Sequence, residues 1–226
     1  MTGVSTPLSP SDRTTVRRGR DRAITDRGAM HALLDDALVA HVGVIVGDHP
    51  VVLPVAFAVD LDGPDDGGSL YIHGSVAARW LVGASTSTVC VAVTEVDGLV
   101  AARSGFHHSM NYRSVVVIGA ARLVTDDDER ARALSLTVDH MVPGRSATLR
   151  DPTRKELAAT SVLAVPLIEA SMKVRAEGAI DEPSDVEAGV WAGVIPIRRT
   201  ADAPVTNADS HNAVPDDVRA RAADLA

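Results

Sequence analysis

Short apolar runs rich in β-branched residues are the feature that most limits what this chain can fold into. Residues 39–46, 51–59, 88–94 and 115–124 are runs of this kind, and turn-forming residues separate them. Seven or eight strands with about three short helices are expected along the chain. The runs do not alternate regularly with helices, as the strands of a parallel sheet would. The sequence therefore predicts a mainly β fold, an antiparallel barrel with short flanking helices.

The first two runs carry a hairpin signal, because the turn residues Gly47, Asp48, His49 and Pro50 lie between them. Pro54 lies inside the second run, where it has no N–H to donate to a neighbouring strand. This strand is therefore expected at a sheet edge, at a bulge, or beside something other than a strand. A ligand is one of these alternatives.

Composition excludes several functions. The 226 residues are 46% hydrophobic, only 3% aromatic, and carry a formal charge of −8. Scarce aromatics and net negative charge argue against nucleic-acid binding and against binding to anionic membranes. The single cysteine, Cys90, excludes an intramolecular disulfide. No segment has the hydropathy of a signal peptide or of a membrane span, so the cytoplasm is the expected location.

The chain is expected to form one domain with two tails. Residues 1–19 are predicted to be a disordered arm, 20–198 the folded domain, and 199–226 a flexible tail. Residues 12–22 contain five arginines and two aspartates, a local balance of five minus two, or +3. We interpret them mainly as a solvated arm, with the alternative that an arginine folds back onto an anionic ligand or a partner subunit.

The second half of the chain contains two helix signals. An acidic run at 126–129 fits the first turn of a helix, where negative charge is favourable. Three-and-four spacing then predicts a buried stripe made of Ala131, Leu134, Val138 and Met141. Thr153 followed by Glu156 is a capping-box pattern that begins a second, shorter helix.

Residues 70–80, LYIHGSVAARW, pass from a strand through a Gly-Ser corner into an expected helix over 75–84. Ser75 and Arg79 are four residues apart, so on a helix they would face the same side and, with the first helical amides, could hold a phosphate. The alternative, slightly favoured by spacing alone, is that Ser75 is only an N-cap, Arg79 a surface charge and His73 a satisfied barrel residue.

Two further segments combine apolar strand with polar groups. Arg113 and Ser114 stand at the start of a strongly apolar run, where an arginine can bind a phosphate or a ring carbonyl, or can pair with an acidic loop residue. Lys173 and Arg175 share one strand face, which suits an anionic ligand or a solvated exterior. The histidines lack the paired helical spacing of a metal site, so no metal is expected.

A series of segments, in order, resembles one family over residues 20–197. The matching segments are RGRDRA, HALLDDALVAHVGV, PVVLPVAF, LYIHGSVAAR, VDGLVAARSGFHHSMNYRSVVVIG, SMKVR and VWAGVIPI. They are similar to the pyridoxamine 5'-phosphate oxidase-like FMN-binding split barrels, in the branch related to nitroimidazole reductases. The resemblance implies an antiparallel split β-barrel and a homodimer with two flavin sites at the subunit interface.

The resemblance also implies roles for individual residues. His73 would lie beside the flavin, near the substrate, as the candidate catalytic residue. The other residues would bind the cofactor: Ser75 and Arg79 at the FMN phosphate, the backbone of Pro54, Val55 and Ala56 along the isoalloxazine edge, Arg113 and Ser114 at phosphate or ring, and Trp191 from the partner chain.

The implied function is an FMN-binding flavoprotein, an oxidoreductase that passes electrons from reduced flavin to a small-molecule acceptor. Residues 51–57 contain no arginine or lysine, whereas pyridoxamine phosphate oxidases carry a basic strand there, so oxidation of vitamin B6 is not expected. Three alternatives remain open: a noncatalytic flavin-binding or sensing protein, a barrel that uses the deazaflavin F420, and a haem-binding barrel with His73 or His107 as axial ligand.

Overall fold

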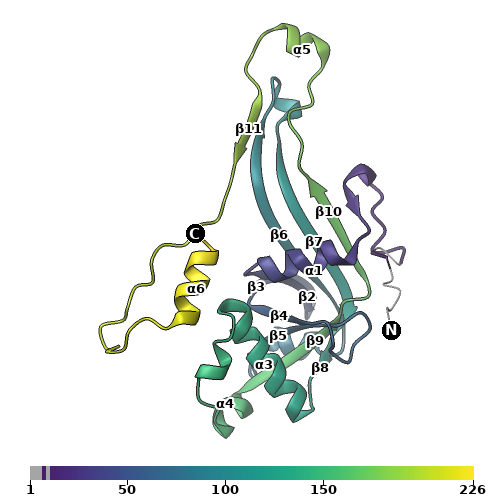
Figure 1. The fold of residues 1–226 in the computed structure, drawn as a ribbon. Coiled ribbons are helices and arrows are strands. Elements are labelled where there is room, and N and C mark those ends of the chain that lie inside the picture. Colours follow the sequence, from purple (N-terminus) through teal and green to yellow (C-terminus); the bar gives the residue numbers. More distant parts are fainter. Residues whose placement is uncertain (1–6, 9–10) are drawn as a thin grey trace, which may run out of the picture. The chain divides into compact units, whose positions relative to one another are not determined.

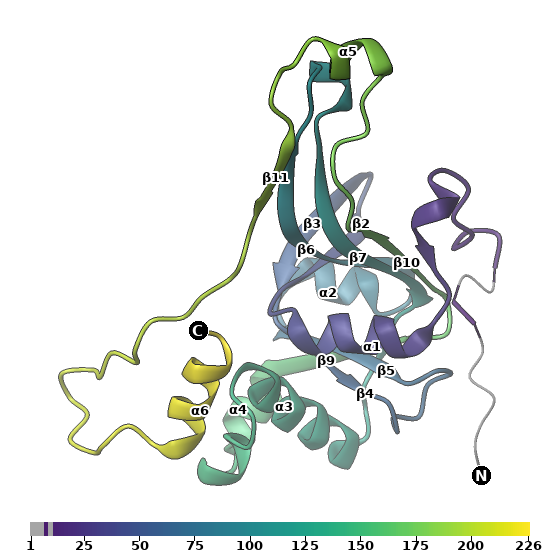
Figure 2. The ribbon, with the colours of Figure 1, turned by 45° about the horizontal axis from the view of Figure 1, so that its top comes forward.

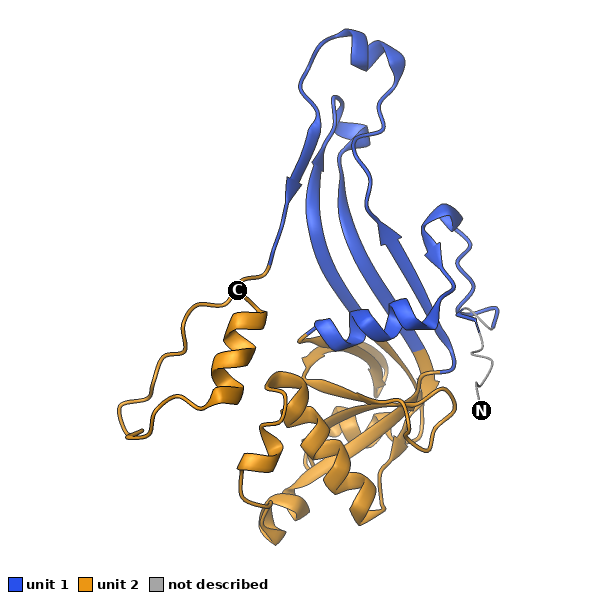
Figure 3. Cartoon of the chain, in the orientation of Figure 1, with its two compact units in different colours: residues 1–37, 92–117, 168–198 blue, residues 38–91, 118–167, 199–226 orange. Residues whose placement is uncertain are grey.

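The computed structural model describes residues 7–8 and 11–226, which fall into two compact units (Figures 1 and 3). Unit 1 comprises residues 1–37, 92–117 and 168–198, and unit 2 comprises residues 38–91, 118–167 and 199–226. Residues 1–6 and 9–10 of the predicted disordered arm lie outside the described residues. The mainly β, antiparallel architecture predicted from the sequence is confirmed.

Unit 1 is built on antiparallel strands. Its sheet has the order β1 (Ala23–Ile24), β10 (Ala170–Arg175), β7 (Ser109–Ala120) and β6 (Thr88–Ala101), and β11 (Gly193–Pro196) pairs with β6. The first residues of β6 and the last of β7 belong to unit 2. The helical elements are η1 (Arg20–Arg22), α1 (Arg27–Asp36), η2 (Gly105–His107) and α5 (Pro183–Glu187).

Helix α1 follows from its apolar spacing. Met30, Leu33 and Leu34 are buried, as the three-and-four spacing of apolar residues requires. Its N-cap is Asp26, whose carboxylate accepts hydrogen bonds from the amides of Gly28 and Ala29. These bonds satisfy two of the helix's free N–H groups.

Unit 2 contains the predicted hairpin, formed by β2 (Ala40–Val46) and β3 (His49–Val55) around Gly47, whose φ is +64°. β3 ends the strand order of its sheet, so of the alternatives left open for Pro54 the edge strand is confirmed. A second sheet has the antiparallel order β4 (Phe57–Asp60), β5 (Ser69–Ser75), β9 (Thr160–Pro166) and β8 (Arg122–Leu123).

The helical elements of unit 2 are α2 (Arg79–Ala84), α3 (Asp127–Met141), η3 (Ser146–Thr148), α4 (Arg154–Ala159) and α6 (Asp216–Asp224). Figures 1 and 2 show α3 beside the four-stranded sheet, where it contacts β4, β5 and β9. Both helix signals of this region are confirmed: Asp126 caps α3, and Thr153 and Glu156 form the capping box of α4. The segment expected to be a flexible tail contains α6.

Candidate functional site

A cavity of about 480 Å³ lies in unit 2, within the range of about 300–1,000 Å³ that is usual for cofactor sites. Strand β5 contributes His73, and α3 contributes an apolar wall of Leu134, Val138 and Met141. The rim comes from η3 and from residues 149–152, with Glu156 of α4. The cavity therefore combines mostly apolar walls with one imidazole and a charged rim.

His73 is the one titratable side chain that the sheet supplies to this cavity. It pairs in register with Val162 of β9 and is half-buried. Its Nδ1 is buried and has no hydrogen-bond partner among the described residues. Burial lowers the pKa of His73, so the imidazole is neutral near pH 7. A neutral imidazole with an unpaired nitrogen is suited to bind a metal or to exchange a proton with a ligand.

The apolar wall corrects one expectation. The predicted buried stripe is wrong, because Ala133 and Thr137 are the buried residues of α3 and Ala131 is exposed. Leu134 and Val138 are half-buried, Met141 is exposed, and all three line the cavity. The apolar periodicity of α3 thus describes the wall of a cavity as much as the face that packs on the core.

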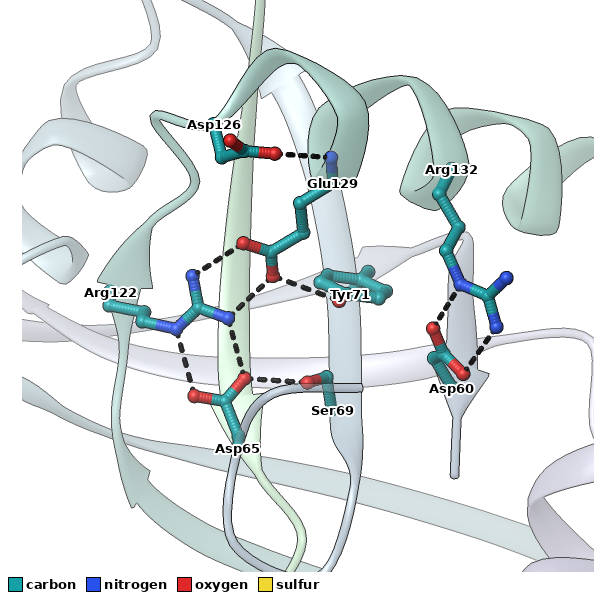
Figure 4. Close-up of polar contacts among 8 residues, drawn as sticks. All are labelled: Asp60, Asp65, Ser69, Tyr71, Arg122, Asp126, Glu129 and Arg132. Atoms are coloured by element: carbon teal, nitrogen blue, oxygen red, sulfur yellow. Dashed lines mark hydrogen bonds and ion pairs between the residues drawn. The ribbon is translucent and has the colours of Figure 1, made fainter. Parts of the chain in front are cut away.

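An ionic network fixes α3 against the four-stranded sheet (Figure 4). Arg122 of β8 donates to both oxygens of Asp65 at 2.8 Å and to Glu129 of α3. Tyr71 donates to Glu129 at 2.9 Å, and burial, with the Glu129 carboxylate beside it, raises the pKa of Tyr71 to about 12. Arg132 donates to both oxygens of Asp60. These contacts hold the helix that forms the cavity wall.

The rim is held by local hydrogen bonds. Asp139 accepts from the amide and hydroxyl of Ser146 at 2.7 Å, which fixes η3 to α3. Arg150 donates to Glu156 at 2.6 and 2.9 Å. Hydrogen bonds from Arg150 and from Thr153 lower the pKa of Glu156 to about 2, so the carboxylate is ionised at neutral pH.

The predicted phosphate-binding residues, Ser75 and Arg79, do not lie on one helix. Ser75 ends β5, its Oγ accepts from the Ala77 amide at 3.2 Å, and its carbonyl accepts from Ala78. Helix α2 begins only at Arg79. Ser75 therefore belongs to a turn that precedes α2 and not to the helix itself. Both side chains are exposed, and among the described residues the Arg79 guanidinium makes no ion pair.

Pro54 and Val55 lie in β3, and Ala56 links β3 to β4. Val55 pairs with Ala40, and Pro54 pairs with His41 of β2. These residues belong to unit 2, as do His73, Ser75 and Arg79, whereas Arg113, Ser114, Trp191 and His107 belong to unit 1.

Arg113 pairs with acidic residues, which was the alternative to binding a ligand. It donates to both oxygens of Asp97 at 3.0–3.2 Å and to Asp36 at 3.2 Å, so its guanidinium is engaged within unit 1. Ser114, the next residue of β7, accepts a hydrogen bond from Thr94. Trp191 precedes β11 and is 67% exposed.

The remaining candidates of unit 1 also have defined positions. His107 lies in η2 with Nε2 3.9 Å from Glu182. Lys173 and Arg175 do not share a solvated face. Arg175 is buried and donates to Asn111 and to the carbonyls of Glu177 and Gly178, whereas Lys173 is half-buried.

Comparison with known proteins gives a consistent picture. A family model described as pyridoxamine 5'-phosphate oxidase matches residues 26–174. The structure of the flavocytochrome Anf3 from Azotobacter vinelandii is 36% identical, with a TM-score of 0.86 over 94% of this chain and 97% of that one. No curated protein matches the chain.

Two other solved structures are informative. A protein from Mycobacterium smegmatis, described as binding FAD and haem, is 36% identical with a TM-score of 0.81, over 88% of this chain and 97% of that one. A candidate 5-nitroimidazole antibiotic resistance protein from Bacteroides thetaiotaomicron is 19% identical over 67% of this chain and 86% of that one, with a TM-score of 0.56, which shows a shared fold. No helix in the described part of the chain is long and apolar enough to cross a membrane.

Proposed function

This chain belongs to the pyridoxamine 5'-phosphate oxidase family, and from that membership we propose that it is a redox protein that binds a flavin and a haem. The proposal draws on two 36% identical relatives, one described as a flavocytochrome and the other as binding FAD and haem. The observation that carries it is the imidazole of His73 in the cavity of unit 2, which is large enough for a cofactor.

The residues of this cavity fit a haem. Axial ligation requires a neutral imidazole, and burial keeps His73 in that form. An unpaired buried nitrogen is unfavourable by about 1–3 kcal/mol unless a bound group changes its surroundings. Leu134, Val138 and Met141 would pack against the macrocycle and exclude water. Bound haem would supply one-electron chemistry.

The flavin would be held by a different set of residues of unit 2. Arg79 and Ser75 would bind its phosphate, since the Arg79 guanidinium has no acidic partner among the described residues. The edge strand at Pro54, Val55 and Ala56 would lie along the ring. Arg113 is a weaker candidate, because two carboxylates already occupy its donors.

We propose FAD as an equal alternative to FMN, because the 36% identical relative from Mycobacterium smegmatis is described as binding FAD. The protein would act as a homodimer in which the partner's Trp191 helps to cover the flavin. Support for a dimer comes from exposed apolar side chains of unit 1, with Phe106 91% exposed and Trp191 67% exposed. Sedimentation of the purified protein tests this directly, since a monomer at micromolar concentration would contradict it.

Oxidation of vitamin B6 is not proposed. Residues 51–57 contain no arginine or lysine, so this segment offers neither cation to the phosphate of a pyridoxamine phosphate substrate. Electron transfer between flavin, haem and a small acceptor agrees better with the apolar cavity.

An absorbance spectrum of the purified protein, with chromatography of the released cofactors, tests the proposal. Flavin bands and a Soret band are expected together, and retention times identify FAD or FMN. Because His107 is the alternative axial ligand, His73→Ala and His107→Ala form a matched pair. Loss of the Soret band is expected only for His73→Ala, with the flavin bands retained. A Soret band lost only in His107→Ala would overturn the assignment, and a protein that binds neither cofactor would overturn the function.

A further inference from the structure

A second cavity, of about 290 Å³, lies in unit 1 between the N-terminal segment and the sheet. Its floor consists of Ser114 and Val116 from β7 with Ser171 and Lys173 from β10. Lys173 pairs directly with Ser114, and Ser171 pairs with Val116. Directly opposed residues of an antiparallel pair, and residues two apart on one strand, point to the same face, so these four side chains form one continuous patch.

The roof is residues 13–17, and it is tied down at both ends. Arg13 forms an ion pair with Glu169, just before β10. Lys173 donates to the Arg18 carbonyl at 2.7 Å. Between these ties Thr14 is buried, with its hydroxyl donating to the Ser11 carbonyl at 3.2 Å. Residues 13–17 thus form one wall of a cavity, whereas the sequence led us to interpret residues 12–22 mainly as a solvated arm.

The polar side chains that line the cavity are positively charged hydrogen-bond donors and hydroxyls. Arg13, Arg17 and Lys173 line it together with hydroxyls of roof and floor, and among the described residues no carboxylate lines it. Glu169 neutralises Arg13 from outside the lining. Within the described part of the chain, the one polar contact of the Arg17 guanidinium is with Asp12 at 3.4 Å, and both side chains are largely exposed. Arg17 and Lys173 therefore retain donors that no described residue uses.

We infer that this cavity binds a phosphate group, either free or as part of a nucleotide. Two cations that approach from roof and floor, with serine hydroxyls between them, satisfy the oxygens of a phosphate better than those of a carboxylate, which has fewer acceptors. This inference does not rest on haem or flavin binding, because of the residues that line the cavity only Ser114 was also expected to contact the flavin.

Calorimetric titration of the full-length protein in phosphate-free buffer tests the inference, with pyrophosphate, ADP and acetate as probes. Pyrophosphate or ADP is expected to bind and acetate to fail, and tighter binding of ADP would identify a nucleotide as the source of the phosphate. Arg17→Gln is expected to weaken binding at least about tenfold, through loss of a charge-assisted hydrogen bond. Lys173→Gln should do the same, and each of the two variants serves as the second test if the other alters the circular dichroism spectrum.

Two controls separate this site from its alternatives. Arg20→Gln removes a charge from the same segment but not from the cavity, so it should leave binding unchanged; an equal loss in this variant would mean that general charge attracts the anion and would overturn the inference. Arg79→Gln tests whether the phosphate binds at the proposed flavin site instead. Binding that is lost in Arg79→Gln and retained in Arg17→Gln, or no binding by either phosphate probe, would also overturn it.

Discussion

Replacement of Arg122 by methionine tests how the wall of the cavity in unit 2 is held. Arg122 is the shared partner of Asp65 and Glu129, whose side chains are only 9% and 15% exposed. Methionine fills similar volume but leaves two poorly solvated carboxylates without a cation. Breaking a buried ion pair costs about 3–5 kcal/mol, and a surface pair contributes about 0–1 kcal/mol. Because the Arg122 side chain is 36% exposed, solvent screening reduces the expected loss to about 2–3 kcal/mol.

Urea and thermal unfolding measure this loss. For a chain of this length about 2–4 °C of melting temperature corresponds to 1 kcal/mol, so a fall of about 4–12 °C is expected. Arg130→Met is the matched control, because Arg130 pairs with exposed Asp127 on the same helix and should cost less than about 1 kcal/mol. Combining Arg122→Met with Asp65→Asn and Glu129→Gln should recover most of the loss.

The stability difference between Arg122→Met and the wild type should also change with pH in a direction that can be checked. Burial raises the pKa of Asp65, but hydrogen bonds from Arg122 and Ser69 outweigh burial and leave the pKa below its ordinary value. The wild type therefore gains stability from Asp65 above about pH 4 and loses it as the pH falls through the folded-state pKa. In Arg122→Met the difference from wild type should be largest near neutral pH and shrink in acid. A loss no greater than that of Arg130→Met at neutral pH would refute the view that this network anchors α3.

Three further predictions concern single side chains. Because burial lowers the pKa of His73, the unfolded state takes up this proton at a higher pH than the folded state, and the apoprotein should lose stability as the pH falls below about 6.5. In urea titrations over that range His73→Gln should lose less stability than the wild type. An equal dependence of stability on pH in the two proteins would contradict this. Arg79→Gln should weaken FMN binding about tenfold or more in fluorescence titrations but leave riboflavin, which lacks the phosphate, unaffected. Arg221→Met should lower the free energy of unfolding in urea by about 0.5–1.5 kcal/mol, because Arg221 donates to the Met141 carbonyl at the end of α3 at 2.9 Å. Arg219→Met should lower it less, because the partners of Arg219 lie on or just before α6. Equal losses would show that α6 does not stabilise α3.

Much of the fold could be predicted from the sequence because its signals are local. Apolar runs, the turn at Gly47 and the capping box at Thr153 and Glu156 each depend on a few neighbouring residues, and each appears where the pattern indicated. Family membership was predicted from segments spread along the chain, which a local pattern cannot imitate, and the family model confirms it.

The site was harder to predict because it depends on which surfaces the fold leaves uncovered. The apolar residues Leu134, Val138 and Met141 have the same spacing whether they pack on a sheet or line a cavity, and only the tertiary structure separates the two. Likewise, four-residue spacing predicts Ser75 and Arg79 on one helix, but residues 75–78 form a turn and α2 begins only at Arg79. The carboxylates that occupy Arg113 lie 16 and 77 residues away in the sequence, beyond any local signal.

Haem titration of the apoprotein, followed by the Soret band, tests the central proposal most directly. The wild type is expected to bind haem saturably with the spectrum of an imidazole-ligated iron. His73→Ala should lose that spectrum and regain it when free imidazole is added, because the substitution leaves space for the ring in a cavity whose apolar wall is intact. An unchanged Soret band in His73→Ala without imidazole, or a wild type that does not bind haem, would contradict the account.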